Sequence, residues 1–274
     1  MIINYKKLIR IHKIDDKIMN KQEWTTGRVT ISIGGQPVNM QMTVPAKPVK
    51  IRRMLPVFRQ MSNSFVKMSV ESVKAAGRDI SCRAGCGACC RQPVPVSETE
   101  AYELAETVEK MPSERRKKIK KRFRDACRQL AEIGWFEQMD ATAGMEKNEQ
   151  RYEVIHEYFK QNIPCPFLEE EACSIHEIRP LACREYLVTS PPENCSKPSA
   201  ENIEMVNLAA KPSATLCSVT RSENLNETVN FVPLVLSLEW AENFSEDETK
   251  RTGEQWMAEF FTHLTKSEIP AESR

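Results

Sequence analysis

The spacing of apolar and polar residues predicts a mostly helical protein that begins with one small β-hairpin. Two short alternating runs, residues 28–33 and 38–44, flank Gly34 and Gly35 and are typical of antiparallel strands joined by a tight turn. From about residue 52 to residue 76, apolar side chains recur at helical spacing, before Gly77 interrupts the pattern. The chain then enters a segment whose composition is unusual.

Further helices are predicted beyond that segment. Ser97 and Glu100 have the spacing of a capping box, and an apolar stripe continues from there to Lys110. Periodicity is weak between residues 196 and 227, and the sequence has no internal repeat. The other predicted helices span residues 113–134, 146–161, 233–243 and 253–266.

Cysteines are concentrated in two short stretches of the sequence. Eight of the ten fall into these groups, a density that serves thiolate chemistry better than packing. Cys127 and Cys217 lie outside them, in apolar patterns where a small buried hydrophobe is the ordinary explanation. The candidate metal ligands are Cys82, Cys86, Cys89, Cys90, Cys165, Cys173, Cys183 and Cys195.

The cellular compartment decides between disulfides and metal ligation for these cysteines. Charges interrupt every apolar stretch of residues 1–20, which is not the pattern of a secretory signal, and no run approaches the roughly 18 apolar residues of a membrane span. We therefore expect a cytoplasmic protein with reduced thiols and no membrane partner. In that setting a cysteine cluster is more often metal-binding or catalytic than a disulfide framework.

The overall charge gives little indication of a charged partner. The formal net charge is +1, with 28% charged residues, so attraction to nucleic acid would have to be local. Residues 115–124 carry eight basic side chains in ten. A solvated helix face is the favoured interpretation, because no aromatic stacking pattern accompanies the charge; contact with RNA or DNA is the weakest hypothesis.

Soft thiolates select zinc, copper(I) or iron–sulfur clusters over hard cations. Zinc takes four ligands in a closed tetrahedron, and a four-iron cluster also needs four cysteines, so the sequence alone leaves the metal and the number of sites open. The spacing Cys82-x3-Cys86-x2-Cys89 is used by radical enzymes that bind S-adenosylmethionine at a four-iron cluster. Against that enzyme class, the sequence after the motif predicts helices rather than a series of βα units.

Several other residues near the cysteines have candidate roles. An anionic cluster would be eased by the neighbouring charges of Arg91, Arg179 and Arg184. His176 is a candidate nitrogen ligand, although a surface or supporting role is favoured. Glu185 and Tyr186, like Arg184, are placed for proton chemistry beside the metal, or equally for salt bridging and packing.

The motifs resemble a known family of cysteine-cluster proteins. The matching segments are Cys82-x3-Cys86-x2-Cys89-Cys90-Arg91, Cys165-Pro-Phe-Leu168, Cys173-Ser-Ile-His-Glu-Ile-Arg179-Pro180 and Cys183-Arg-Glu-Tyr186. Together, over residues 78–196, they resemble the YkgJ-type CxxxCxxCC proteins, described as zinc- or iron-chelating. The resemblance implies metal binding by the eight cysteines, with Arg179 and Pro180 shaping the loop that presents Cys183. Flagellin lysine N-methylases share the motif.

These observations lead to one prediction for the whole chain. We expect a mainly α, single-domain protein over residues 27–274, with a metal-binding core at 78–196, a small N-terminal hairpin and an irregular cysteine-rich centre; residues 1–26 form a charged N-terminal segment. The expected cofactor is an iron–sulfur cluster, favoured narrowly and typically of the four-iron type, or a zinc ion. An iron–sulfur-dependent methylase-like enzyme and a zinc-stabilised, non-catalytic interaction module are the alternatives. Substrate and protein partner are not identified, and the sequence leaves open whether the protein is an enzyme.

Overall fold

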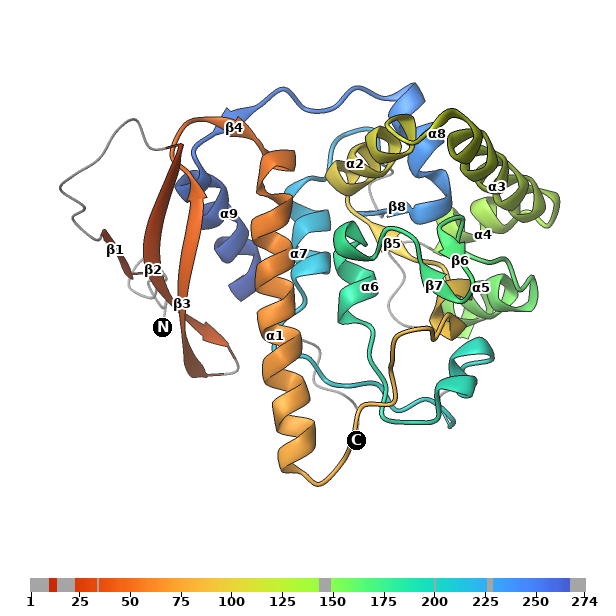
Figure 1. Cartoon of the computed structure of the whole chain (residues 1–274), viewed down its shortest axis with the longest axis horizontal. Coiled ribbons are helices and arrows are strands. Elements are labelled where there is room, and N and C mark those ends of the chain that lie inside the picture. Colours follow the sequence, from red (N-terminus) through yellow and green to blue (C-terminus); the bar gives the residue numbers. More distant parts are fainter. Residues whose placement is uncertain are drawn as a thin grey trace.

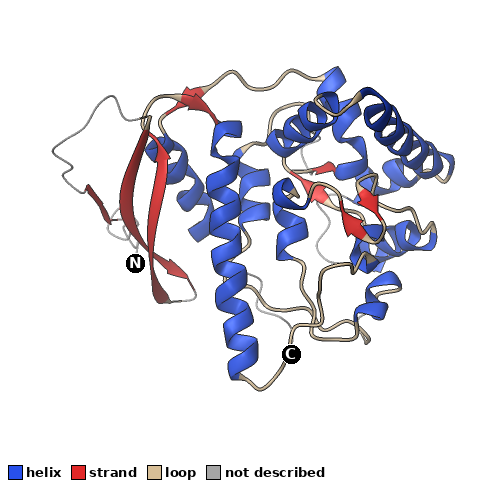
Figure 2. Ribbon diagram, viewed as in Figure 1, coloured by secondary structure: helices blue, strands red, loops and turns tan. Residues whose placement is uncertain are grey.

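The computed structural model describes residues 10–13, 23–33, 35–142, 149–199, 201–225 and 229–266. Helices make up most of this structure, and the longest strands lie together at one end (Figure 2). The predicted mainly α fold with a small N-terminal hairpin and an irregular centre is therefore confirmed. Its assignment as a single domain stays a prediction.

The hairpin consists of β2 (Trp24–Ile33) and β3 (Gln36–Pro45), paired antiparallel with Val29 opposite Met40. It is longer than its apolar alternation indicated, because polar cross-strand pairs such as Thr26 and Thr43, whose hydroxyl oxygens lie 2.9 Å apart, continue the ladder. A third strand, β1 (Arg10–Lys13), pairs with β2 and was not predicted from the charged N-terminal segment. Gly34 lies outside the described residues.

Helix α1 (Leu55–Ala75) follows the short 3-10 helix η2 (Ile51–Met54) and crosses the middle of the molecule (Figure 1). Helices α7 (Pro212–Val219) and α9 (Gly253–Lys266) pack around it, and the hairpin covers α9. The periodicity predicted α1 and α9, whereas the short α7 was missed.

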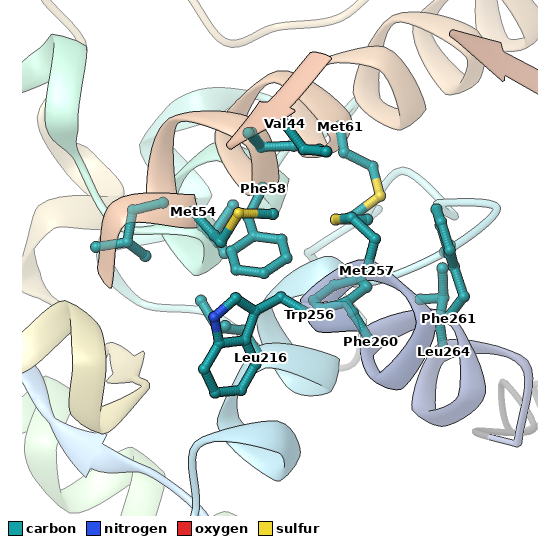
Figure 3. Close-up of a cluster of buried hydrophobic side chains, with 14 of the residues drawn as sticks. Val44, Met54, Phe58, Met61, Leu216, Trp256, Met257, Phe260, Phe261 and Leu264 are labelled. Atoms are coloured by element: carbon teal, nitrogen blue, oxygen red, sulfur yellow. The ribbon is translucent and has the colours of Figure 1, made fainter. Parts of the chain in front are cut away.

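The core between these elements is the largest hydrophobic cluster of the described residues (Figure 3). Phe58 and Phe260, both fully buried, stack with their ring centroids 4.6 Å apart. Trp256 donates its indole N–H to the carbonyl of Val49 at 2.9 Å. Strand β4 (Val49–Lys50) pairs with β9 (Lys250–Arg251), so the last part of the chain is joined to the first.

A second group of helices contains α2 (Glu98–Glu109), α3 (Ser113–Glu132), α4 (Trp135–Thr142) and α5 (Glu149–Lys160). The capping box of α2 is formed as predicted, because the Ser97 side chain accepts from the Glu100 N–H while the Glu100 carboxylate accepts from the Ser97 N–H. The chain turns sharply at Gly134, where φ is +64°, and α4 was not predicted beyond it.

The predicted helix 233–243 begins later than its sequence pattern indicated. Pro233 belongs to β8 (Val232–Pro233), which pairs with β5 (Pro95–Val96). The chain then forms the 3-10 helix η6 (Leu234–Leu236) before α8 (Ser237–Asn243). Only residues 237–243 of the predicted span are therefore α-helical.

Short elements carry the cysteines between the two groups of helices. None exceeds five residues, and the segments that connect them are loops and turns. These elements are η3 (Ala88–Arg91), β6 (Leu168–Glu169), β7 (Ala172–Cys173), η4 (His176–Ile178), α6 (Leu181–Glu185) and η5 (Pro192–Ser196). Among the described residues, no helix is both long enough and apolar enough to cross a membrane.

Candidate metal centre

The first cysteine loop, residues 78–91, runs from the end of α1 to η3. Its start is fixed by Ser81, whose N–H donates to the Val188 carbonyl at 3.0 Å and whose hydroxyl donates to the Thr189 carbonyl at 2.9 Å. Gly85 adopts a φ of +78°, which favours glycine and turns the chain between Cys82 and Cys89. The loop therefore folds back on itself within the span of the motif.

The second cysteine loop, residues 161–175, contains the two-stranded β6–β7 unit. Glu170 and Glu171 form its turn with positive φ values of 50° and 56°. The ring of Phe167 is buried and meets Phe123 of α3 edge-on, with the centroids 5.3 Å apart. Apolar packing thus fixes this loop between Cys165 and Cys173.

The first and second cysteine loops are in direct contact. The Cys165 N–H donates to the Cys90 carbonyl at 2.7 Å. Arg91 forms a bidentate pair with Glu171, at 3.0 and 2.7 Å, and also donates to the Gly87 carbonyl. Residues separated by 75 positions in the sequence, Cys90 and Cys165, are therefore neighbours, as convergence of the two cysteine groups requires.

Gly87 allows this close approach. A Cβ atom at this position would lie 2.4 Å from a Glu171 carboxylate oxygen and 2.9 Å from the Leu168 Cδ1. The Glu171 Cα would be 3.2 Å away, so backbone as well as side chains limits the space. Glycine at this position in the motif therefore serves loop-to-loop packing.

A third cysteine segment, residues 176–196, presents Cys183 and Cys195. Pro180 is the N-cap of α6, and the adjacent Leu181 N–H donates to the Glu100 carboxylate at 2.8 Å. This hydrogen bond joins the start of α6 to the start of α2, so the capping-box glutamate also fixes the helix that carries Cys183. Cys195 lies on η5, which packs against η3 of the first loop.

The Arg184 side chain holds the third segment in place by hydrogen bonds to backbone carbonyls of that segment. This buried side chain donates to the carbonyls of Glu177 and Arg179 and to the Asn63 side-chain oxygen on α1. Its hydrogen bonds to Glu177 and Arg179 hold the loop, and its role as a charge beside a cluster stays a prediction.

The cysteine thiols influence one another's pKa. The Cys90 thiol donates to Cys89, and this hydrogen bond, with the nearby charge of Arg179, lowers the pKa of Cys89 to about 7. Burial raises the pKa of Cys165 to about 12 and that of Cys195 to about 11, and like-charge repulsion from other cysteines adds to both shifts.

The positive charge of Arg179 acts on thiols of both cysteine groups. Burial raises the pKa of Cys173 and of Cys183, and the charge of Arg179 opposes both shifts. Its Nε atom is buried and has no hydrogen-bond partner among the described residues; the same holds for the Ser174 hydroxyl, adjacent to Cys173. The cysteine segments thus contain two buried hydrogen-bond donors that have no acceptor among the described residues.

All ten cysteines are free thiols. Among the described residues, no three His, Cys, Asp or Glu side chains form a group ready to hold a metal ion. The eight cysteines therefore stay predicted ligands. His176 is exposed, and its pKa is lowered by the charge of Arg179 and by burial; its assignment as a ligand is untested. Cys217 is buried in α7, as expected for a residue outside the site.

Cys127 and the basic run lie on α3. The Cys127 thiol donates to the Val235 carbonyl at 3.0 Å. Most of the basic side chains pair with acids on α2 or α3 or on the second cysteine loop. Arg122 pairs with Glu169 and also donates to the carbonyls of Pro166 and Leu168, which flank the turn after Cys165. Sequence reasoning missed this role, because a basic run does not show which residue bonds to a distant loop.

A pocket of about 240 Å³ lies beside the third segment. Its lining mixes apolar and polar groups and includes Cys183, so it opens directly next to one of the predicted ligands. Glu185, whose burial raises its pKa to about 7, lines the pocket and accepts from the Ser213 N–H at 2.9 Å. The other lining residues include Gln92, Val94, Tyr186, Met205, Lys211 and Ser213.

Comparison with known families agrees with this site. Residues 81–208 match the model of the CxxCxxCC family, described as a "putative zinc- or iron-chelating domain". The match over these residues confirms the resemblance to a cysteine-cluster family seen in the sequence. No curated protein and no solved structure matches the chain.

Proposed function

We propose that the protein is a metalloprotein whose clustered cysteines hold an iron–sulfur centre. Metal chelation is the function described for the family matched by residues 81–208. The contact between the first and second cysteine loops and the packing of η3 on η5 support a shared binding region. The type of centre is our inference.

One observation favours an anionic, sulfur-rich centre in particular. Buried donors are almost always hydrogen-bonded in folded proteins, yet the Arg179 Nε has no partner among the described residues. Inorganic sulfides and thiolates accept hydrogen bonds, and cationic donors around them stabilise the negative charge of a cluster. Arg179, whose charge acts on Cys89, Cys173 and Cys183, fits that role.

The chain offers candidate ligands, positive charge and apolar packing to such a centre. Four cysteines suffice for a four-iron cluster, and the three cysteine segments, which contact one another, carry eight. When bound, such a centre supplies electron transfer or an open iron site for substrate. Arg179 favours the thiolate form of its neighbours, and Phe167, two residues from Cys165, is buried in apolar packing.

Anaerobic purification followed by elemental analysis, acid-labile sulfide measurement and a visible spectrum tests the proposal. We expect a brown protein that contains iron and sulfide. The Cys86→Ser variant should lose the colour, whereas Cys127→Ser, a cysteine outside the groups, should retain it. A colourless protein that contains stoichiometric zinc would contradict the iron–sulfur assignment and favour a zinc-stabilised interaction module.

A methylase-like enzyme is the second candidate function, and the pocket beside Cys183 favours it. Catalysis needs space for a substrate next to the centre, and this pocket combines apolar lining residues with Lys211 and Tyr186. Titration of the anaerobic protein with S-adenosylmethionine, followed by calorimetry and by the visible spectrum, tests this function. Absence of both binding and spectral change would eliminate methyl transfer.

A further inference from the structure

A second cavity, larger than the pocket beside Cys183, lies between α3 and the segment formed by η6 and α8. Its volume is about 530 Å³, which is within the range typical of small-molecule sites. The lining comes from residues 120–127 on one side and residues 235–243 on the other, and none of these is a predicted metal ligand. We call this cavity the α3–α8 groove.

The base of the α3–α8 groove is apolar. Helix η6 packs on α3, and the Cys127 thiol donates to the Val235 carbonyl at 3.0 Å, which joins the two sides of the groove. Phe123 and Val235 are buried, whereas Leu238 is half-buried. Side chains of this kind can cover the apolar part of a bound molecule.

The two walls of the groove carry opposite charges. Arg124 lines it from α3, and Glu239 and Glu242 line it from α8. These two glutamates are three residues apart, so they share one face of their helix. Burial raises the pKa of the Cys127 thiol to about 11, and the charge of Glu239 adds to this shift, as expected for a carboxylate near the base.

These opposite charges do not neutralise one another across the groove. In the part of the chain that the structure describes, no ion pair joins Arg124 to an acidic side chain. The other cation of the lining, Lys120, pairs with Glu109 of α2 at 2.5 Å. A molecule that carries both a carboxylate and an ammonium group could therefore pair with both walls at once.

The length of the groove limits the size of such a molecule. Residues 120 and 127 are seven positions apart on α3, a distance of about 10 Å at the helical rise of 1.5 Å per residue. A partner helix of average length would extend over about 17 Å. An extended peptide of two or three residues spans about 7–10 Å and matches the groove.

We propose that the α3–α8 groove binds a short apolar peptide of two or three residues with free termini. The peptide carboxylate pairs with Arg124, its ammonium group pairs with Glu239 or Glu242, and its side chains cover the apolar base. Binding at this groove needs no metal, so it goes beyond the proposed function and is tested separately from it.

Leucyl-leucine and trileucine are the probes for a test on the full-length wild-type protein. Saturation-transfer NMR measures binding, and mass spectrometry follows the alkylation of Cys127 by iodoacetamide under anaerobic conditions. We expect saturable binding of at least one peptide, and alkylation of Cys127 roughly tenfold slower at about nine times the Kd. Absence of binding by both peptides up to about 10 mM, or binding that leaves Cys127 unprotected, would overturn the proposal.

Capped forms of the peptide that binds more tightly test the two charge contacts. An N-acetyl cap removes the ammonium group, and a C-terminal amide removes the carboxylate. Each cap should weaken binding roughly tenfold, as expected for the loss of a charged hydrogen bond. Capped peptides that bind as tightly as the free peptide would contradict the proposed pairing with the walls.

Matched variants assign each contact to a wall. Arg124→Gln should weaken binding of the free peptide roughly tenfold and leave binding of the amide unchanged, because the amide has no carboxylate to pair. The double variant Glu239→Gln with Glu242→Gln should show the same relation with the acetylated peptide. Lys118→Gln removes an exposed cation of α3 outside the groove and should bind like the wild type. Equal weakening of free and capped peptides by the groove variants would refute the pairing.

Discussion

The core around α1 and the three cysteine segments, residues 78–91, 161–175 and 176–196, are built in different ways. Around α1, long elements bury large apolar side chains, and Met54, Leu55 and Phe58 are fully buried. The segments that carry the clustered cysteines contain only elements of five residues or fewer, and individual polar contacts, together with the apolar packing of Phe167, fix their loops. The comparison teaches that hydrophobic burial is sufficient for the scaffold, whereas the site also depends on specific hydrogen bonds and, in our account, on a metal.

The largest expected effect comes from the scaffold. The Phe58→Ala substitution removes a ring that stacks on Phe260, and it should lower the free energy of unfolding by about 3–5 kcal/mol. Chemical denaturation measures this loss, with Met68→Ala, an exposed position on the same helix, as the near-neutral control. Metal content per folded chain should not change. Substantial metal loss from folded Phe58→Ala protein would contradict the separation of scaffold and site.

Arg184→Lys should have the next largest effect, and it should act mainly on the site. Lysine keeps the charge but cannot supply the planar set of donors that reaches Glu177, Arg179 and Asn63. We expect a loss of about 2 kcal/mol in stability and roughly tenfold weaker metal binding, typical of residues that support metal ligands. Competition with a chromophoric chelator measures the affinity. Arg128→Lys, exposed on α3, is the control, and equal affinities of the two variants would refute this role.

Gly87→Ala tests the contact between the cysteine loops. The added methyl group would collide with Glu171 and Leu168, so we expect a cost of about 1–2 kcal/mol and faster metal release. Gly27→Ala serves as the control, because a Cβ atom there meets nothing within 4 Å. Stopped-flow measurement of metal release gives the rate, and identical rates for the two variants would show that the contact does not matter.

The pH dependence of the metal-free protein is the smallest effect expected. Burial raises the pKa of Cys195 from 9.0 to about 11, so the folded state keeps a proton that the unfolded state releases. Stability from this group is therefore complete below pH 9 and is lost between about pH 9 and 11, by at most about 1.4 kcal/mol per pH unit. Urea titrations across that range measure it, with Cys195→Ser as the comparison. A wild-type slope no steeper than that of the variant would contradict it.

Sequence reasoning succeeded where the structural signal was local and periodic. The apolar repeat predicted α1, and the Ser97–Glu100 spacing predicted the start of α2, because each pattern extends over several turns or uses a known cap. Helices α6 and α7 were missed because five and eight residues are too few to show a period. Pro233 was assigned to a helix because its pairing partner, β5, is distant in the sequence.

The sequence predicted the chemistry of the candidate site but not the contacts that arrange its residues. Cysteine spacing identified the eight candidate ligands and the family. The match to the family model confirms the family resemblance, and the ligands stay predictions. The roles of Arg122, Glu100 and Gly87 depend on contacts between segments that are far apart in the sequence. Such contacts follow from the fold, so no local pattern of one sequence shows them.

X-ray absorption spectroscopy of the anaerobically purified wild-type protein tests the central claim most directly. If sulfur atoms from the three cysteine segments surround an inorganic centre, the metal edge should show a shell of sulfur ligands at about 2.3 Å. The spectrum should contain no major nitrogen or oxygen shell. A metal bound mainly by nitrogen or oxygen, or protein that contains no iron or zinc, would contradict the account.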